Sequence, residues 1–421
     1  TIYGGDFLAN QTPVKNMCEA APEIIYIMDR MGGMFNRTPE GNIELRRLGG
    51  AKNSRSAFAG STTGQQLLYA LDEQVRRFEA SGQVEKYEGW QFLSVVQDSQ
   101  GICCGICAQH LYTGEIETFS GDAVILATGG PGMVFGRTTM SVICTGYPAS
   151  QVYQQGVYYA NGEFVQFHPT AIPGDDKNRL MSESARGEGG RVWTYKEGKP
   201  WYFLEEWYPA YGNLVPRDIA SRAIFKVCVE MGLGIEGTNQ VYLDLSHKDP
   251  GELERKLGGI LDIYEKFVGE DAKKVPMKIF PAVHYFMGGL WVDFNQMTNI
   301  PGLFACGEVD YQYHGANRLG GNSLMSSLYG GAVAGKSVIN YIQGRSRLAS
   351  EIEKKPFLTE QNFQKKKYEQ LFKMHGRENP YSLHDELGTV MLENVGVVRY
   401  NDRLKKADQK IQELMERYQN I

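Results

Sequence analysis

Two segments that combine short apolar runs with glycine-rich turns lie on either side of a long stretch of different composition. Residues 117–130 contain a short apolar run that ends in a Thr-Gly-Gly turn, and residues 288–344 return to strand, glycine-rich turn and helix. Between them, from about residue 150 to 285, the sequence is aromatic and rich in loops. A domain that is interrupted by a second domain and then resumed gives this order. We therefore predict that one domain is inserted into another.

Length and charge narrow the class of protein. The 421 residues suffice for two or three domains around a sizeable ligand. Lys and Arg number 44 against 49 Asp and Glu, without a long run of either sign, which argues against a nucleic-acid partner. No stretch of about 18 apolar residues occurs, so the sequence predicts no transmembrane span and leaves docking onto a membrane-embedded partner open.

Cysteine usage and the first residue add two expectations. Seven cysteines at irregular spacing favour a reducing compartment over a disulfide framework. The chain begins at Thr1, within what reads as the middle of a domain. We therefore expect a fragment or a processed chain.

Apolar spacing predicts helices at two places. Residues 63–82 carry apolar side chains at helical spacing, with Thr62 or Thr63 available as a cap. These side chains are Leu67, Leu68, Leu71, Val75 and Phe78. Near the C-terminus, apolar residues repeat at intervals of three and four over about two heptads, which predicts a helix packed onto the body rather than a coiled coil. They are Leu404, Ala407, Ile411, Leu414 and Tyr418.

Three β-like runs, at residues 92–98, 101–112 and 117–130, predict a hairpin that leads into a central strand. In the middle run, Cys104 and Cys107 have the spacing of half a zinc site or of a redox pair, and Cys103 and His110 lie nearby. No second cysteine pair exists, and the neighbours alternate with apolar residues. We therefore favour small buried strand residues over a metal site.

The literal GxGxxG pattern at residues 232–237 has the wrong context for a dinucleotide fingerprint. Such a fingerprint follows a strand and opens a helix. Here a helix-like segment, 219–231, precedes the glycines and a strand-like one, 240–246, follows them. We interpret the pattern as a glycine-rich helix-to-strand connection, not as a phosphate loop.

Residues 314–336 offer a better candidate site. A Gly-Gly turn is followed by Asn322, Ser323 and an apolar helix. Free amides at such a helix start, with glycines that permit close approach, suit an anionic or carbonyl-bearing ligand. Tight helix packing at Gly330 and Gly331 is the alternative interpretation.

Arg318 lies inside that turn, and a site there needs further polar groups from elsewhere in the chain. Candidate segments are 167–170, 182–190, 216–218 and 283–285. Taken singly, each is more often structural, because an isolated His or Arg–Asp pair is usually a satisfied hydrogen-bond partner. If residues 182–186 are helical, Glu183 and Arg186 fall at i and i+3 and pair on one face, along which a proton can pass.

Read in order, the segments ATGGPG, QFHPT, SESARGEGG, PRDIASR, HYFMGG, ACGE and HGANRLGGNSL resemble the flavoprotein subunit of the succinate dehydrogenase and fumarate reductase family. These seven motifs follow the family's order at compatible distances over nearly the whole chain. Residues 171–177 and 182–195 most resemble the menaquinone-linked succinate dehydrogenases with a di-haem anchor.

The resemblance implies an α/β fold with an α+β capping domain. It implies a discontinuous FAD-binding dinucleotide domain over residues 1–165 and 286–345, a capping domain over 166–285, and a helical domain over 346–421. Family members begin with a strand, a GxGxxG turn and a helix, followed by a histidine that tethers FAD, and they continue beyond the position of residue 421. This sequence contains neither the N-terminal phosphate-binding segment nor the C-terminal continuation.

The resemblance also implies the site residues. The positions of His168, Ser182, Glu183, His284 and Arg318 bind the dicarboxylate in the family. The guanidinium of Arg318 and the imidazole and hydroxyl donors match the two carboxylates of succinate in charge. Oxidation sends a hydride to flavin N5 and a proton to Arg217. A relay through Glu183 and Arg186 keeps the charge of the buried cluster constant, so no neutral guanidine accumulates.

For FAD, the matching positions are Thr128, Gly129 and Gly130 beside the dinucleotide, Glu308 near the ribityl chain, and Ser323 and Leu324 at a helix start. That helix start would stabilise charge on the reduced ring. Two positions depart from the family's pattern. Ser182 stands where many relatives have Thr, which preserves the hydroxyl, and Tyr147 stands where many place an Asp near the flavin, so we assign no contact there.

The implied reaction is the oxidation of succinate to fumarate, with electrons passed through an iron–sulfur subunit to a quinone. The implied partners are that subunit and a cytochrome b membrane anchor, with the protein peripheral at the cytoplasmic face of the plasma membrane. A soluble fumarate reductase or an L-aspartate oxidase relative is an alternative, which co-purifying iron–sulfur and haem absorbance would exclude. A non-catalytic fragment of such a flavoprotein is another, and it would lack flavin absorbance bands.

Overall fold

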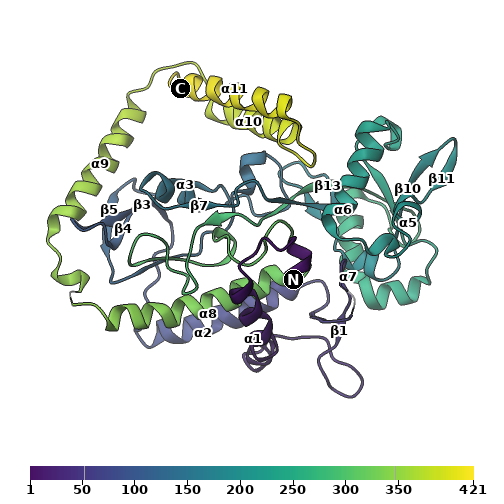
Figure 1. The fold of residues 1–421 in the computed structure, drawn as a ribbon, viewed down its shortest axis with the longest axis horizontal. Helices are drawn as coiled ribbons and strands as arrows, with labels where there is room; N and C mark the ends of the chain where they lie inside the picture. The colour runs from purple at the N-terminus through teal and green to yellow at the C-terminus, as the bar shows by residue number, and fades with distance from the viewer. Residues whose placement is uncertain (52, 347) are drawn as a thin grey trace.

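The computed structural model describes residues 1–51, 53–346 and 348–421. At one end of the molecule, a six-stranded antiparallel sheet has the strand order β11-β10-β12-β13-β8-β9 (Figure 1). Its strands are β8 (Val165–Ile172), β9 (Arg179–Leu180), β10 (Arg191–Lys196), β11 (Lys199–Trp201), β12 (Val241–Asp244) and β13 (Met277–Phe286). The helices around it are α5 (Phe203–Trp207), α6 (Arg217–Phe225) and α7 (Pro250–Val268). Apolar side chains from this sheet and its helices form one core cluster.

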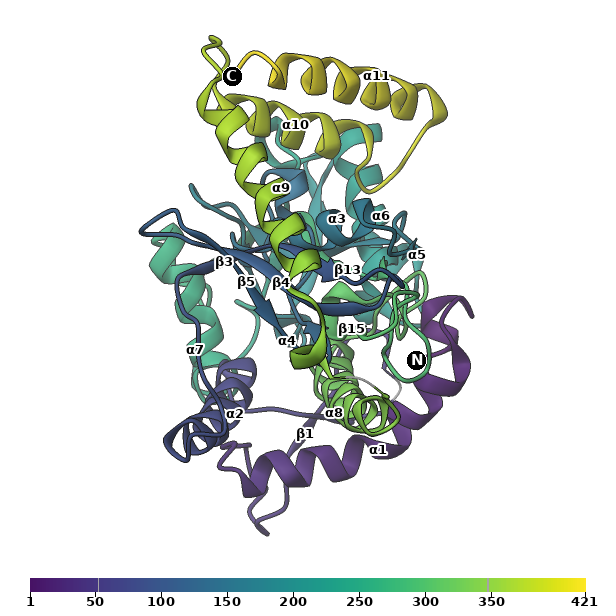
Figure 2. The ribbon, with the colours of Figure 1, turned by 90° about the vertical axis from the view of Figure 1, so that its left-hand side faces the viewer.

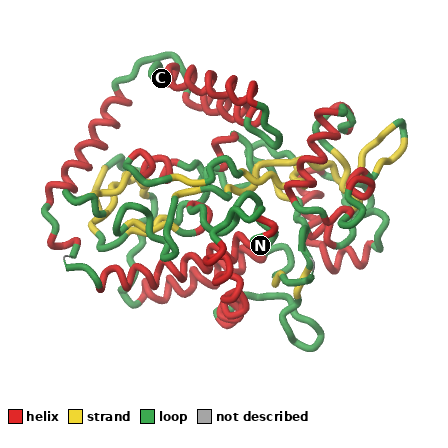
Figure 3. The backbone as a smooth tube through the Cα atoms, in the orientation of Figure 1, coloured by secondary structure: helices red, strands yellow, loops and turns green. Residues whose placement is uncertain are grey.

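Smaller sheets form the middle and the other end of the molecule (Figure 3). Strands β3 (Trp90–Gln97), β4 (Cys103–His110) and β5 (Ile116–Ser120) make an antiparallel sheet. Strand β6 (Val124–Leu126) pairs in parallel with β15 (Leu303–Ala305), so two segments far apart in the sequence lie side by side. The two-stranded pairs are β1 (Leu45–Arg46) with β2 (Ser56–Ala57), and β7 (Tyr159–Ala160) with β14 (Gly289–Leu290).

Three long helices lie along one side of these sheets. Helix α8 (Asn322–Gln343) contacts α1 (Gln11–Arg30), and α2 (Thr63–Ala80) lies on the same side of the sheets (Figures 1 and 2). The short helix α3 (Tyr147–Gln154) packs on β3. None of the helices in the described parts of the chain combines the length and the apolar character that a membrane crossing requires.

Helix α2 confirms the helix predicted at residues 63–82, but its details differ from the expectation. Only Leu67 of its five apolar residues is buried, since α2 meets its neighbours through the narrow stripe of Leu67 and Ala70. The expected threonine cap is wrong. Thr63 Oγ1 accepts instead from the Ala59 amide at 3.0 Å, and Thr62 forms no capping hydrogen bond.

The C-terminal part contains α9 (Lys354–Phe372), α10 (Pro380–Asn394) and α11 (Asn401–Tyr418). The helix predicted near the C-terminus is confirmed as α11, and it packs on α10 (Figure 2). Helix α10 in turn lies on the short helical turn η2 (Gly132–Phe135), where the Cα atoms of Gly388 and Gly136 approach closely. The C-terminal helix therefore reaches the body through α10.

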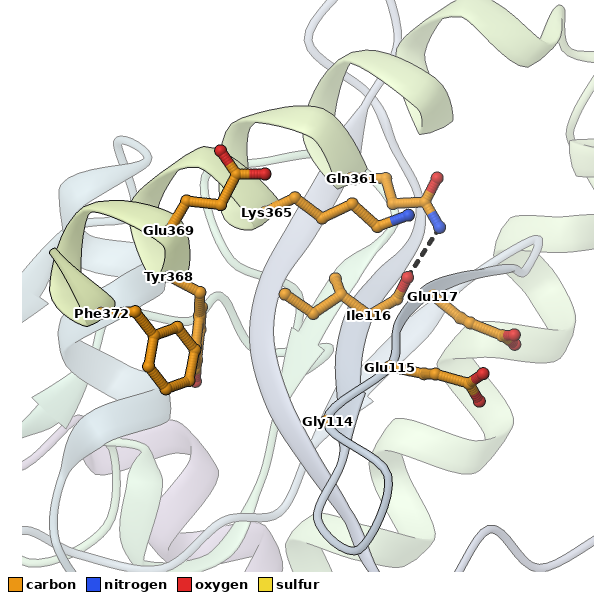
Figure 4. Close-up of a pocket in the computed structure, with 9 residues that line it drawn as sticks. All are labelled: Gly114, Glu115, Ile116, Glu117, Gln361, Lys365, Tyr368, Glu369 and Phe372. Atoms are coloured by element: carbon orange, nitrogen blue, oxygen red, sulfur yellow. Dashed lines mark hydrogen bonds between the residues drawn. The ribbon is translucent and has the colours of Figure 1, made fainter.

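Helix α9 covers the three-stranded sheet. The Gln361 side chain donates to the Ile116 carbonyl at 2.7 Å, beside a pocket of about 350 Å³ (Figure 4). The pocket is lined by Gly114, Glu115, Ile116, Glu117, Gln361, Lys365, Tyr368, Glu369 and Phe372. These are all different from the residues that the sequence predicts for the functional site.

Two local predictions are confirmed. The glycines at 232–237 connect a helical segment, α6 and a π-helical turn η4 (Lys226–Glu230), to strand β12. Cys103, Cys104 and Cys107 are buried in β4, and burial raises their pKa values to about 12, 11 and 12. These thiols are therefore protonated at neutral pH, unlike metal ligands or redox thiolates. The predicted central strand is shorter than its five-residue apolar run, because only residues 124–126 pair with β15.

Candidate active site

A cavity of about 800 Å³ lies where the six-stranded sheet meets the start of α8. Among its lining residues are six that the sequence analysis assigned to substrate binding or proton transfer: His168, Ser182, Glu183, Arg217, His284 and Arg318. They come from five separate segments of the sequence, which the fold brings together. Arg186 lies behind Glu183 and does not line the cavity.

Two neighbouring strands, β8 and β13, supply the histidines. Cross-strand partners shift between Val283 and Tyr285, so His284 is the extra residue of a β-bulge in β13. A bulge of this kind re-aims a side chain relative to the regular pleat. The His284 and His168 rings therefore meet edge to face, with their centroids 4.9 Å apart.

Both imidazoles are held neutral in the ligand-free protein. Burial lowers the pKa of His168 well below its ordinary value, and Arg217 lowers it further. Burial and then Arg217 and Arg318 lower the pKa of His284 in the same way. The Thr170 amide donates to Nδ1 of His168 at 3.3 Å, so the proton of this neutral ring sits on Nε2. That buried Nε2 meets no hydrogen-bond partner in the described part of the chain.

Glu183 is a buried carboxylate between two buried arginines. One oxygen accepts from Arg186 Nη2 at 2.8 Å, and the other accepts from Arg217 Nη2 at 3.1 Å. Burial alone raises the pKa of Glu183, but Arg217 and Arg186 outweigh it and hold the pKa below its ordinary value. The expected i, i+3 pair forms because residues 184–187 make the single turn α4 (Ser184–Gly187). Arg186 also donates to the carbonyls of Asn213 and Val215.

Arg318 is a buried cation without a carboxylate partner among the described residues. Its guanidinium carbon lies 4.3 Å from the centre of the Tyr285 ring, and its Nε atom has no hydrogen-bond partner in that part of the chain. Burial and the nearby Arg217 lower the pKa of Arg318 to about 9. It is thus still charged at neutral pH, at the wall of the cavity, where an anion would compensate it.

The remaining predicted binding residues fall into two groups. Ser182 lines the cavity, and its hydroxyl lies 3.1 Å from that of Ser184. Ser323 and Leu324 also line the cavity, at the start of α8, where the N-cap residue Gly321 supplies no side-chain cap. The Asn322 amide donates to the Leu319 carbonyl at 3.2 Å, and no side-chain cap at Gly321 covers the amides that follow it in this 22-residue helix, so those can meet a ligand.

Thr128, Gly129, Gly130 and Glu308 lie together but are not on the cavity wall. A Cβ atom on Gly130 would lie only 2.7 Å from Glu308 Oε1, so glycine is required for this approach. The Thr128 hydroxyl is buried without a partner among the described residues. Burial raises the pKa of Glu308 to about 7, and its carboxyl accepts from the Phe286 amide at 2.9 Å. An unpaired hydroxyl and a carboxyl group fit the donors of a ribityl or ribose chain.

Several residues that lie next to the lining side chains, without lining the cavity themselves, were missed by sequence reasoning. Gln166 accepts from Arg217 Nη1 at 3.1 Å and donates to the Arg318 carbonyl at 2.7 Å, which ties together two predicted residues. It lies in the QFHPT segment, so the motif was a signal for it. Thr139 bonds to His284 at 2.7 Å, and a Cβ atom on Gly49 would lie only 2.5 Å from Glu183 Oε1. No sequence pattern predicts these two contacts, because each forms only when a loop folds onto a residue that is far away in the sequence.

Comparisons with known proteins decide the family. The family of FAD binding domains matches residues 1–324, and the fumarate reductase flavoprotein C-terminal family matches residues 384–421. The chain is 66% identical over 421 residues to the succinate dehydrogenase flavoprotein subunit of Bacillus subtilis, covering 100% of this chain and 72% of that one. The chain belongs to the succinate dehydrogenase and fumarate reductase flavoprotein family.

Solved structures of this family have the same fold. E. coli quinol fumarate reductase matches with a TM-score of 0.91 at 30% identity, covering 100% of this chain and 72% of that one. Mycobacterium smegmatis Sdh1 matches with a TM-score of 0.81 at 30% identity, covering 100% and 70%. The resemblance, the α/β fold class and the FAD cofactor predicted from the seven motifs are thereby confirmed, and the chain is that of an FAD-dependent oxidoreductase. The domain limits and the roles of individual site residues remain predictions.

Proposed function

We propose that this family member oxidises succinate to fumarate in the cavity described above. The observation that carries the proposal is the buried guanidinium of Arg318, which has no carboxylate partner among the described residues. Beside it, Nε2 of His168 is likewise buried and unpaired. The two carboxylates of a dicarboxylate ligand satisfy these two groups, and charge-assisted bonds to a planar guanidinium are among the strongest that a protein makes.

The bound dicarboxylate lies between donors from separate elements. Arg318 and His284 bind one carboxylate, and His168 and Ser182 bind the other, while Glu183 forms the wall next to Arg217. Among the residues that the structure describes, every cation that lines this part of the cavity is a guanidinium, and Glu183 is already bound by two arginines. The ammonium group of L-aspartate would find no free anion there. The charges therefore favour succinate over an amino acid.

Proton transfer follows the buried chain of Arg217, Glu183 and Arg186. Arg217 accepts the proton that leaves the substrate carbon while its own proton passes to Glu183, which lies 3.1 Å away. Glu183 is in turn 2.8 Å from Arg186. Because each group gives up a proton as it receives one, no neutral guanidine persists in the cluster. The same residues run in reverse as the acid for fumarate reduction.

FAD, when bound, supplies the acceptor for the hydride. Thr128, Gly129, Gly130 and Glu308 would hold its dinucleotide and ribityl parts. Ser323 and Leu324 would present the positive end of α8 to its ring system.

The redox partners belong to the same proposal. The Bacillus subtilis relative is named as a subunit, and the chain thus has relatives that act within larger assemblies. We propose an iron–sulfur subunit as the electron acceptor and a cytochrome b anchor of the di-haem, menaquinone-linked kind beyond it. The chain then lies peripherally at the cytoplasmic face of the membrane.

Anaerobic addition of succinate to the purified holoenzyme tests the function. The flavin absorbance is expected to bleach with succinate and to recover with fumarate. The Arg217→Gln variant is expected to bind the dicarboxylate but to bleach at least about 100-fold more slowly, since removal of a general acid or base costs this much. A bleaching rate of Arg217→Gln within about tenfold of the wild-type rate would contradict the role of Arg217 in proton transfer. A chain that purifies without flavin would instead support a non-catalytic role.

A further inference from the structure

A two-threonine turn packs against the bulge that carries His284. The carbonyl oxygen of Val283 accepts from Thr138 Oγ1 at 2.9 Å and from the Thr139 amide at 3.0 Å. A carbonyl oxygen has two lone pairs, and these two donors use both. The Thr139 hydroxyl lies 3.3 Å from the same oxygen but only 2.7 Å from Nδ1 of His284.

These distances decide which atom donates. If Nδ1 carried the proton, the Thr139 hydroxyl would have to turn its own hydrogen to the Val283 carbonyl, over the longer distance and to an oxygen already satisfied. If the hydroxyl donates to Nδ1, the bond is short and no group competes for it. The neutral imidazole then carries its proton on Nε2. Among the described residues, Nδ1 has no other donor than Thr139.

We propose that Thr139 is a positioning residue that fixes the tautomer of His284, so that Nε2 offers an N–H to the substrate carboxylate. The inference rests on the proposed dicarboxylate site. It gives His284 the same tautomer as His168, whose Nδ1 accepts from the Thr170 backbone amide. The two rings thus present two neutral N–H donors. The opposite tautomer would turn a lone pair toward a carboxylate, which is repulsive.

The charges around His284 make the tautomer matter. Its neighbours in the cavity are Arg217, Arg318, Glu183 and His168. The two guanidiniums disfavour an imidazolium, which would donate from both nitrogens whatever Thr139 did. A neutral ring has one N–H only, so its placement decides whether His284 attracts or repels the ligand.

Three variants of the full-length holoenzyme test the inference. Thr139→Val removes the hydroxyl at nearly constant shape, and Thr139→Ser retains it. Thr138→Val removes the neighbouring hydroxyl, which binds the Val283 carbonyl and the Met140 amide but not the imidazole. The probe is malonate, an unreactive dicarboxylate, titrated against the flavin absorbance between about pH 6 and 8, with the FAD content checked for each variant.

We expect the Kd of Thr139→Val for malonate to rise about 10- to 100-fold at pH 8, the loss typical of a hydrogen bond to a charged group. Thr139→Ser should stay within about threefold of wild type. The ratio of Thr139→Val to wild type should stay the same between about pH 6 and 8, because burial and the two guanidiniums hold the His284 imidazole neutral over this range. Any loss in Thr138→Val should be much smaller than the loss in Thr139→Val, because the Thr138 hydroxyl does not contact the imidazole. Taking the ratio at each pH cancels the ionisation of malonate itself.

Three results would overturn the inference while leaving the proposed function intact. They are unchanged binding by Thr139→Val, equal loss in Thr139→Val and Thr139→Ser, or equal loss in Thr139→Val and Thr138→Val. The last of these would mark Thr139 as a purely structural support of the loop. Failure of the wild-type holoenzyme to bind malonate would instead overturn the dicarboxylate function, and the tautomer assignment with it.

Discussion

A single methyl group added at Gly49 should displace the proton-relay carboxylate. Gly49 lies in the loop before β2, and a Cβ atom there would be 2.5 Å from Glu183 Oε1 and 3.4 Å from Arg186 Nη2. The backbone of Gly49 has no positive φ, so Ala is conformationally tolerated. The perturbation of Gly49→Ala is therefore steric and acts on Glu183.

The structure sets the size of the effect. To restore an ordinary contact, the carboxyl oxygen must retreat by about 0.9 Å. The Glu183 carboxyl group has little room to move away from Gly49, because Gly320 lies close to its other oxygen. A Cβ atom on Gly320 would be only 2.6 Å from Glu183 Oε2. Overpacking of this kind costs about 1–3 kcal/mol of stability. Displacement of a catalytic group by about 1 Å can cost about 100-fold in turnover.

Steady-state succinate oxidation with an artificial electron acceptor, normalised to bound flavin, measures the loss. We expect kcat to fall about 10- to 100-fold while the Kd for malonate changes less than about threefold, since Arg318 and the histidines stay in place. Gly335→Ala is the matched control, because its Cβ position in α8 has open space around it. If Gly49→Ala turned over within about threefold of wild type, the carboxylate position would not limit proton transfer and the reasoning would be refuted.

Two further perturbations probe buried charges. Arg318→Met should abolish malonate binding yet raise the unfolding temperature of the ligand-free protein. The reason is that replacing an uncompensated buried charge by an apolar side chain is often stabilising by about 1–4 kcal/mol. A fall in the unfolding temperature would mean that Arg318 is already compensated. Burial raises the pKa of Asp310 from 3.8 to about 7, so the folded chain holds this proton more tightly than the unfolded chain. That contribution to stability is present at low pH and is lost as the pH rises from about 4 to 7, and Asp310→Asn should flatten this part of a plot of Tm against pH.

The sequence predicted helices and local residue pairs better than it predicted the individual hydrogen bonds and contacts that the residues make. Helix α2 followed from apolar spacing, and the pairing of Glu183 with Arg186 followed from an i, i+3 interval within one turn. Both depend on local geometry alone. The threonine cap of α2 failed because the Thr63 hydroxyl bonds backward to Ala59, a competing local bond that composition does not reveal.

Contacts at long sequence separation were beyond prediction from a single chain. Thr139 and His284 are 145 positions apart, and their bond exists because a bulge in β13 turns His284 toward a loop from another segment. A loop that folds back in the same way brings Gly49 close to Glu183. The motif resemblance located Arg217, Arg318 and the histidines without this geometry, because it compares patterns rather than contacts.

The buried charges explain why this cavity suits a dicarboxylate rather than a simpler anion. Among the described residues, the three buried guanidiniums of Arg186, Arg217 and Arg318 gather around one buried, ionised carboxylate, that of Glu183, so this buried cluster carries two excess positive charges. The imidazoles are neutral, and Glu308, with a pKa raised to about 7, is only partly charged near neutral pH. A dianion cancels the excess, whereas a monoanion leaves one buried cation uncompensated. The relay preserves this balance because it moves protons through Arg217 and Glu183 without changing the number held by the cluster.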